Sequence, residues 1–156
     1  MAAGTRLTAI HLVLGVTVMA LFTAAGLLGA WRWWQVRSST WFWRLVRAAQ
    51  VALGVQVVLG GVLLAAGHEP RDSLHLVYGL LPVGVSFVAE QLRIAAAQTV
   101  LDARGLADAQ AVGRLPEDEQ RSVVTAILRR ELGAMTLACV FIAGLVIRAG
   151  FVSGGL

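Results

Sequence analysis

The stretch of sequence that decides the fold is residues 7–30, LTAIHLVLGVTVMALFTAAGLLGA. It carries no charged side chain, and its most polar group is His11. Roughly 20 such residues let a helix cross the apolar core of a bilayer, so this stretch predicts a transmembrane helix. A secretory signal has a shorter apolar run and a small-x-small cleavage site. This run instead ends in Trp31-Arg32-Trp33-Trp34, so we expect the helix to remain uncleaved.

Three further apolar stretches have the same character, and they cover residues 45–66, 74–97 and 132–151. Of the 156 residues, 58% are hydrophobic and only 14% are charged, whereas a soluble domain keeps about a quarter of its residues charged. Open strands cannot satisfy their backbone in lipid. We therefore expect an all-α integral membrane protein, a single membrane domain over residues 1–156 that forms an up-down four-helix transmembrane bundle.

The arginines predict which side of the membrane each connection faces. Short arginine-rich loops stay in the cytoplasm, and all but Arg6, Arg71 and Arg148 of the 13 basic residues lie in the connections after the first and third spans. We therefore expect a multi-pass protein of the cell membrane with both termini and the turn at residues 68–72 outside. All five tryptophans fall in or beside the first cytoplasmic connection, where indole rings favour the headgroup region.

The longer cytoplasmic connection, residues 99–130, is predicted to be a helical hairpin. Apolar and charged residues alternate at helical spacing up to Leu115, and the acids that follow Pro116 suit the first turn of a new helix. The third span is thus expected to continue beyond the membrane, turn near residues 113–116 and return into the fourth span. A solvated face explains its charges, and a docking surface for a larger complex is the alternative.

An internal repeat indicates two tandem helical hairpins. His11-Leu12-Val13-Leu14-Gly15 opens the first span and His75-Leu76-Val77-Tyr78-Gly79 opens the third, with four of five positions identical. A parallel duplication relates its halves by an axis along the membrane normal. The repeat therefore predicts that His11 and His75 lie at equal depth near the outer face, roughly 5 to 6 Å inside their helices.

These two histidines are candidate axial ligands of haem b. Intramembrane histidines normally point into a bundle, and a pair at one level suits a haem iron. Gly15 and Gly79 follow four residues later on the same helix faces, where a missing side chain would admit a flat macrocycle or, alternatively, a neighbouring helix.

Three residues near the same surface are further candidates. Arg6 and Arg71 could pair with haem propionates, and His68 could be a third metal ligand, a propionate partner or a surface residue. For each of the three, an ordinary interfacial role is the alternative.

Two polar residues inside the spans need partners. Gln56 lies at mid-membrane in the second span and is expected to bond across helices. Glu90 lies in the cytoplasmic half of the third span, and Arg93, three residues on, is its expected ion-pair partner. A proton or quinone role for Glu90 is the functional alternative.

The string Gln56-Val57-Val58-Leu59-Gly60-Gly61, followed by an outer turn and His75-Leu76, resembles the haem A synthase family. There a glutamine and paired glycines on one helix precede a haem-liganding histidine at the start of the next, and each half is a four-helix bundle. The resemblance covers about residues 8–80. Because the chain has half the family's length and carries Leu7 where the family has a catalytic glutamate, the resemblance implies haem binding more than the synthase reaction. Cytochromes of the b561 type share this general design.

Other chemistries lack their residues in this sequence. Cys139 has no second cysteine to pair with and is expected to pack as a small apolar residue. The basic residues are too thinly spread for nucleic-acid binding, and no phosphate-binding loop or catalytic motif is present. The sequence thus favours a small haem b protein that transfers electrons or handles haem. The alternatives are a non-catalytic accessory subunit of a larger respiratory or other membrane complex, and a metal-handling or transport protein.

Overall fold

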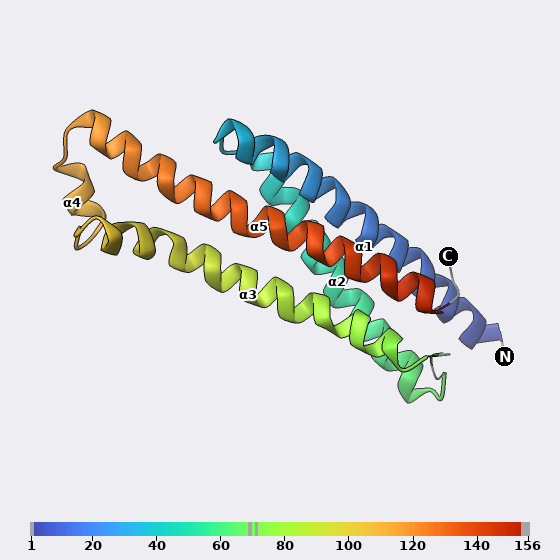
Figure 1. Ribbon diagram of the computed structural model, residues 1–156. Coiled ribbons are helices and arrows are strands. Elements are labelled where there is room, and N and C mark those ends of the chain that lie inside the picture. Colours follow the sequence, from blue (N-terminus) through green and yellow to red (C-terminus); the bar gives the residue numbers. More distant parts are fainter. Residues whose placement is uncertain (1, 69, 71, 154–156) are drawn as a thin grey trace.

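The computed structural model describes residues 2–68, 70 and 72–153, and every regular element within them is a helix (Figure 1). A short helix, α4 (Ala109–Gly113), joins the last two long ones. Each of the four long helices is long and apolar enough to cross a membrane, which confirms the all-α class and the four predicted spans. The long helices are α1 (Ala2–Gln35), α2 (Thr40–Ala65), α3 (Leu74–Ala103) and α5 (Glu117–Ser153).

The first connection is shorter than the sequence predicts. Helix α1 continues through the tryptophans to Gln35, and α2 begins at Thr40, so only residues 36–39 link them. The early start of α2 has a local cause, because the buried Ser39 hydroxyl accepts a hydrogen bond from the backbone N–H of Phe42 at 3.3 Å. Such an N-cap satisfies one of the donors that a helix start leaves without a partner.

Consecutive long helices run in opposite directions, and α5 lies between α1 and α3 (Figure 1). Helix α1 packs against both α2 and α5, and α3 packs against α5. Helices α2 and α3 make few contacts. The two hairpins, α1–α2 and α3–α5, are therefore joined mainly through the contact between α1 and α5.

Small residues allow α1 and α5 to approach closely. A Cβ atom added at Gly26 of α1 would lie 3.0 Å from the side chain of Val140 in α5. Cys139, the residue before Val140, is buried in the same core, as expected for a small apolar side chain. The largest fully buried apolar side chains of this core come from α1, α2 and α5, and they are Val18, Phe22, Phe42, Val46, Leu132, Met135 and Ile142.

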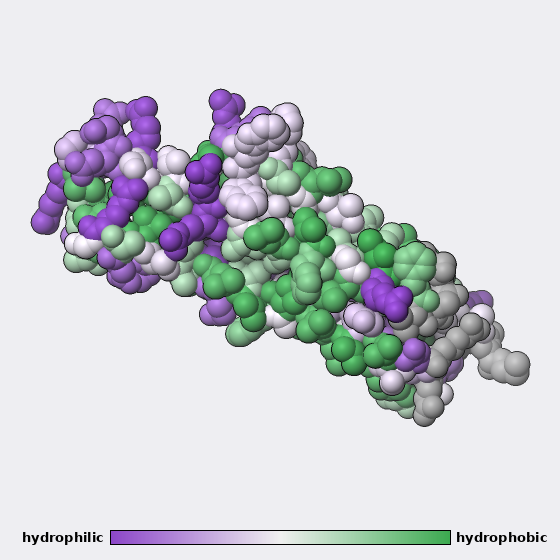
Figure 2. Space-filling view, viewed as in Figure 1, coloured by the Kyte–Doolittle hydropathy of each residue, from purple (hydrophilic) through white to green (hydrophobic). Residues whose placement is uncertain are grey.

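The outer surface is apolar over most of its length. Figure 2 shows hydrophobic side chains over the middle of the molecule and hydrophilic ones gathered toward the end that carries α4. Large apolar side chains such as Val58, Phe87, Ile94 and Phe141 are more than half exposed. A surface of this kind suits hydrocarbon as its solvent, because lipid tails impose no cost on exposed apolar groups.

The segment between α3 and α5 differs from the predicted hairpin. Helix α3 ends at Ala103 and does not continue to residue 113, because the chain turns at Gly105, whose φ is +66°. Glycine adopts this conformation without steric cost. Asp108 then caps α4 by accepting a hydrogen bond from the backbone N–H of Ala111 at 2.8 Å. A second small core holds the end of α3 against the start of α5, and its buried members are Val100, Leu101 and Val123.

One polar cluster links α2 and α3 where they otherwise scarcely touch. Glu90 accepts a hydrogen bond from Arg93 at 2.9 Å, which confirms the expected pair. Its carboxylate also accepts from Arg47 at 2.7 Å and from Gln50 at 3.0 Å, both on α2. The spacing of residues along α3 could not reveal these two partners, because they lie 40 and 43 residues away along the chain.

We expect the Glu90→Gln variant to loosen this junction, since it leaves two guanidinium groups without their shared counter-charge. Glu90 is only 18% exposed, so the free energy of unfolding should fall by about 1 kcal/mol, near the upper value for exposed pairs. Thermal unfolding in detergent measures the change. Glu117→Gln is the control because Glu117 and its partner Arg121 are 87% and 78% exposed. An equal loss in both variants would show that Glu90 does not link the helices.

Candidate functional site

His11 of α1 and His75 of α3 lie together, although their two helices are not extensively packed against each other. The centroids of the two imidazole rings are 6.2 Å apart, and the ring planes meet at 62°. Both side chains are half-buried. The structure therefore brings together the two histidines that the sequence repeat pairs. They lie near the starts of α1 and α3, and these helix ends lie away from α4 (Figure 1).

A backbone carbonyl orients His75. The Nδ1 atom of its ring lies 3.2 Å from the carbonyl oxygen of Ala149 in α5. In the neutral ring, Nδ1–H donates to this carbonyl, and the lone pair then resides on Nε2. Histidines that bind metals are commonly fixed in this way, because the bond sets both the tautomer and the ring orientation.

A glutamine amide orients His11. The Nε2 atom of His11 lies 3.2 Å from the amide nitrogen of Gln56 in α2, so Gln56 finds its expected partner across helices. The Nδ1 atom of His11 and the amide oxygen of Gln56 are buried and have no partner among the described residues. Heavy-atom positions do not distinguish the two ends of an amide. With the amide turned over, its oxygen accepts from Nε2–H of His11, and the lone pair of the ring lies on Nδ1.

Glycines make room for this arrangement. A Cβ atom added at Gly60 of α2 would lie 3.1 Å from the Cε1 atom of His11, and one added at Gly15 would lie 3.1 Å from the Gln56 amide nitrogen. Gly15 thus accommodates Gln56. A Cβ atom at Gly79 would meet nothing within 4 Å, so Gly79 borders open space. No side chain marks Gly60 as a site residue, although its i+4 spacing from Gln56 places the two on one face of α2.

The remaining predicted residues are not part of the pair. Arg6 is exposed five residues before His11 on α1, and His68 is exposed in the connection after α2. Arg71 lies outside the described residues. Within the part of the chain that the structure describes, no three His, Cys, Asp or Glu side chains gather as a metal site. Among the described residues, His68 is thus not gathered with His11 and His75 in one group, and its possible role as a third metal ligand stays a prediction.

A small cavity of about 290 Å³ lies between α2 and α3 beside Glu90. Gln50 and Ser86 line it together with Leu53 and Phe87, and Gln50 donates to the Ser86 hydroxyl at 3.1 Å. The Glu90 carboxylate is already bonded to three side chains. These contacts favour the structural role of Glu90 over a proton or quinone role.

No family model, curated protein or solved structure matches this chain. The resemblance to the haem A synthase family therefore stays a prediction from its residues. The structure itself defines a helical protein with four helices able to cross a membrane and a histidine pair between two of them.

Proposed function

We propose that this protein is a small membrane-embedded haem b protein that binds the iron between His11 and His75. The observation that carries the proposal is the 6.2 Å separation of the two imidazole centroids, on helices that make little other contact. Bound haem would supply a one-electron redox centre, so the function is electron transfer or haem handling.

The separation of the rings supports the proposal quantitatively. A metal–nitrogen bond to imidazole is about 2 Å long, and the ring centre lies about 1 Å behind the nitrogen. Two imidazoles on one iron therefore hold their ring centres about 6 Å apart. The centroids of His11 and His75 are already at that separation, so loading would require rotation of the rings more than movement of α1 and α3.

The partners of the two rings also support it. The Ala149 carbonyl engages Nδ1 of His75 and leaves Nε2 for a metal. With the Gln56 amide turned over, its oxygen accepts from Nε2–H of His11 and leaves Nδ1 for the metal. Both partners would hold the rings in place and increase their basicity. Gly79 borders space that a macrocycle edge could enter. We propose Arg6, exposed at the same end, as a partner of a haem propionate.

The proposal includes a membrane topology. The four long helices form an up-down bundle in the cell membrane, with both termini and the histidine pair toward the outer face. Consecutive long helices are antiparallel, and hydrophobic side chains cover the middle of the molecule, which supports this arrangement. The arginines support it too, because most of them lie toward the α4 end, which the positive-inside rule assigns to the cytoplasm.

An absorption spectrum tests the function. Protein produced with a supply of haem precursor and purified in mild detergent should carry one haem b per chain. It should show an intense Soret band and a sharp α band on reduction. A preparation that stays colourless after haem supplementation would overturn the proposal. A colourless protein that copurifies with other membrane subunits would support the accessory-subunit alternative.

Gly60→Ala should weaken haem binding about tenfold, the scale on which residues that orient ligands act. The new Cβ atom would lie 3.1 Å from His11 Cε1, so the imidazole must move away from its position. Titration of the haem-free protein with haem measures the affinity. Gly61→Ala is the matched control, since a Cβ atom at Gly61 meets nothing within 4 Å. A loss of affinity in Gly61→Ala but not in Gly60→Ala would contradict the assigned geometry.

A further inference from the structure

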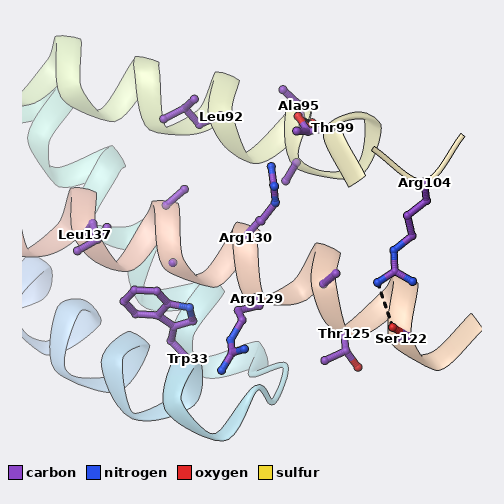
Figure 3. Close-up of a pocket in the computed structure, with 14 residues that line it drawn as sticks. Trp33, Leu92, Ala95, Thr99, Arg104, Ser122, Thr125, Arg129, Arg130 and Leu137 are labelled. Carbon is purple, nitrogen blue, oxygen red and sulfur yellow. Dashed lines mark hydrogen bonds between the residues drawn. The ribbon is translucent and has the colours of Figure 1, made fainter. Parts of the chain in front are cut away.

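A larger open cavity lies at the other end of the molecule, far from the histidine pair. It has a volume of about 670 Å³ and lies between α3, α5 and the end of α1 (Figure 3). Sites for small ligands usually have volumes of roughly 300 to 1,000 Å³. The cavity is thus large enough for the head of a lipid and the start of its chains.

One end of this cavity is bordered by three arginines, whose side chains point in different directions (Figure 3). Arg104, Arg129 and Arg130 line it, and Arg104 donates to the Ser122 hydroxyl at 3.0 Å. Among the described residues, no carboxylate lies within ion-pair distance of these three guanidinium groups. Three positive charges therefore border one cavity without a counter-charge from the described part of the chain. An anion is the ligand that this end favours.

The other end of the cavity is apolar. Figure 3 shows Leu92 and Leu137 at the end away from Arg104. Both leucine side chains are more than half exposed, so this end opens onto the apolar outer surface. Small residues, among them Ala95 and Ala134, also line the cavity. The groove thus runs from cationic groups to a surface suited to hydrocarbon.

The indole ring of Trp33 lines the cavity on the side of α1. A Cβ atom added at Gly133 would lie 3.0 Å from the indole ring of Trp33, so the ring rests on the backbone of α5. Trp33 is one of the tryptophans that mark the headgroup region of the membrane. The cavity therefore lies at the depth where the phosphate of a lipid meets its acyl chains.

We propose that this cavity binds an anionic phospholipid. The phosphate lies beside Arg104, Arg129 and Arg130, whose exposed side chains can turn toward it and donate to its oxygens. An acyl chain passes Ala95 and Ala134 toward Leu92 and Leu137. Zwitterionic lipids bind less well, because their ammonium groups meet three uncompensated arginines. Basic pockets between membrane helices on the cytoplasmic side are suited to anionic headgroups.

Bound lipid would also connect the two hairpins. The cavity is lined by Trp33 of the α1–α2 hairpin and by residues of α3 and α5. An anion held there offsets the repulsion among the arginines and fills the space between the hairpins. This inference is independent of haem, because the histidine pair lies at the opposite end of the molecule.

Native mass spectrometry of the detergent-purified full chain tests the proposal. The added probes are phosphatidylglycerol, phosphatidylcholine and inorganic phosphate, each at the same concentration. We expect one phosphatidylglycerol retained per chain and at least tenfold weaker retention of phosphatidylcholine. Inorganic phosphate should not be retained, because it lacks the acyl chain. Equal retention of both lipids, or retention of free phosphate as strong as that of phosphatidylglycerol, would overturn the proposal.

Two variants place the lipid in the cavity. The double variant Arg129→Gln/Arg130→Gln should reduce phosphatidylglycerol retention at least tenfold. Arg37→Gln/Arg114→Gln removes the same charge at exposed positions outside the cavity and should retain the lipid. Ala134→Leu narrows the groove with all arginines intact and should also weaken retention. Equal retention by both double variants, or unchanged retention by Ala134→Leu, would show that the lipid binds elsewhere.

Discussion

His75→Ala protein is expected to lose the Soret and α bands, with a fall of at least about 100-fold in haem affinity. The alanine removes a proposed iron ligand and leaves the carbonyl of Ala149 without the imidazole that it orients. His11→Ala should have the same effect, because iron held by a single imidazole loses the second axial bond. Haem titration followed by absorbance measures both losses.

The third histidine of the chain supplies the control for this prediction. His68 is exposed in the connection after α2, so His68→Ala should keep the full spectrum. Free imidazole added to His75→Gly protein should restore part of the low-spin spectrum, because it can enter the space that the side chain leaves. If His68→Ala lost the bands while His75→Ala kept them, the assignment of the iron ligands would be wrong.

Gly29→Ala is expected to destabilise the fold by about 2 to 3 kcal/mol, the upper range for overpacking of a buried site. Gly29 lies on α1 where α2 and α5 meet it. An added Cβ atom would lie 2.6 Å from the ring of Phe42 and in direct conflict with the hydroxyl of Thr136. Phe42 and Thr136 are 0% and 2% exposed, so neither can move aside without displacing a helix.

The measurement is the unfolding midpoint of the purified protein in detergent, with Gly84→Ala as the matched control. Gly84 lies within α3, and a Cβ atom there meets nothing within 4 Å. Alanine favours a helix over glycine by roughly 1 kcal/mol, so Gly84→Ala should keep or raise the midpoint. Equal midpoints for Gly29→Ala and the unsubstituted protein would show that the three helices do not meet closely at Gly29.

The four long helices could be predicted from the sequence because length and apolar content decide whether a segment can cross a membrane. Their ends were harder to place, since single residues determine them. Ser39 starts α2 earlier than predicted, and the positive φ of Gly105 ends α3 earlier. The packing of the helices could not be read from apolar content, because almost every face of a membrane helix is apolar.

The histidine pair could be predicted because a repeat relates positions that are far apart in the chain. The partners that orient the rings could not all be found in this way. Gln56 is a polar residue in an apolar helix, and so its need for a partner was evident. The carbonyl of Ala149 gives no side-chain signal. Gly60 contributes by having no side chain, which only the position of His11 in space reveals.

The ligation state of the iron tests the central claim most directly, because the claim is that His11 and His75 hold one iron between them. Electron paramagnetic resonance of the oxidised, haem-loaded protein measures it. The account predicts a low-spin ferric signal from a six-coordinate iron with two imidazole ligands, and its loss in His11→Ala and in His75→Ala. A high-spin signal from the unsubstituted protein, or a low-spin signal that survives both substitutions, would contradict it.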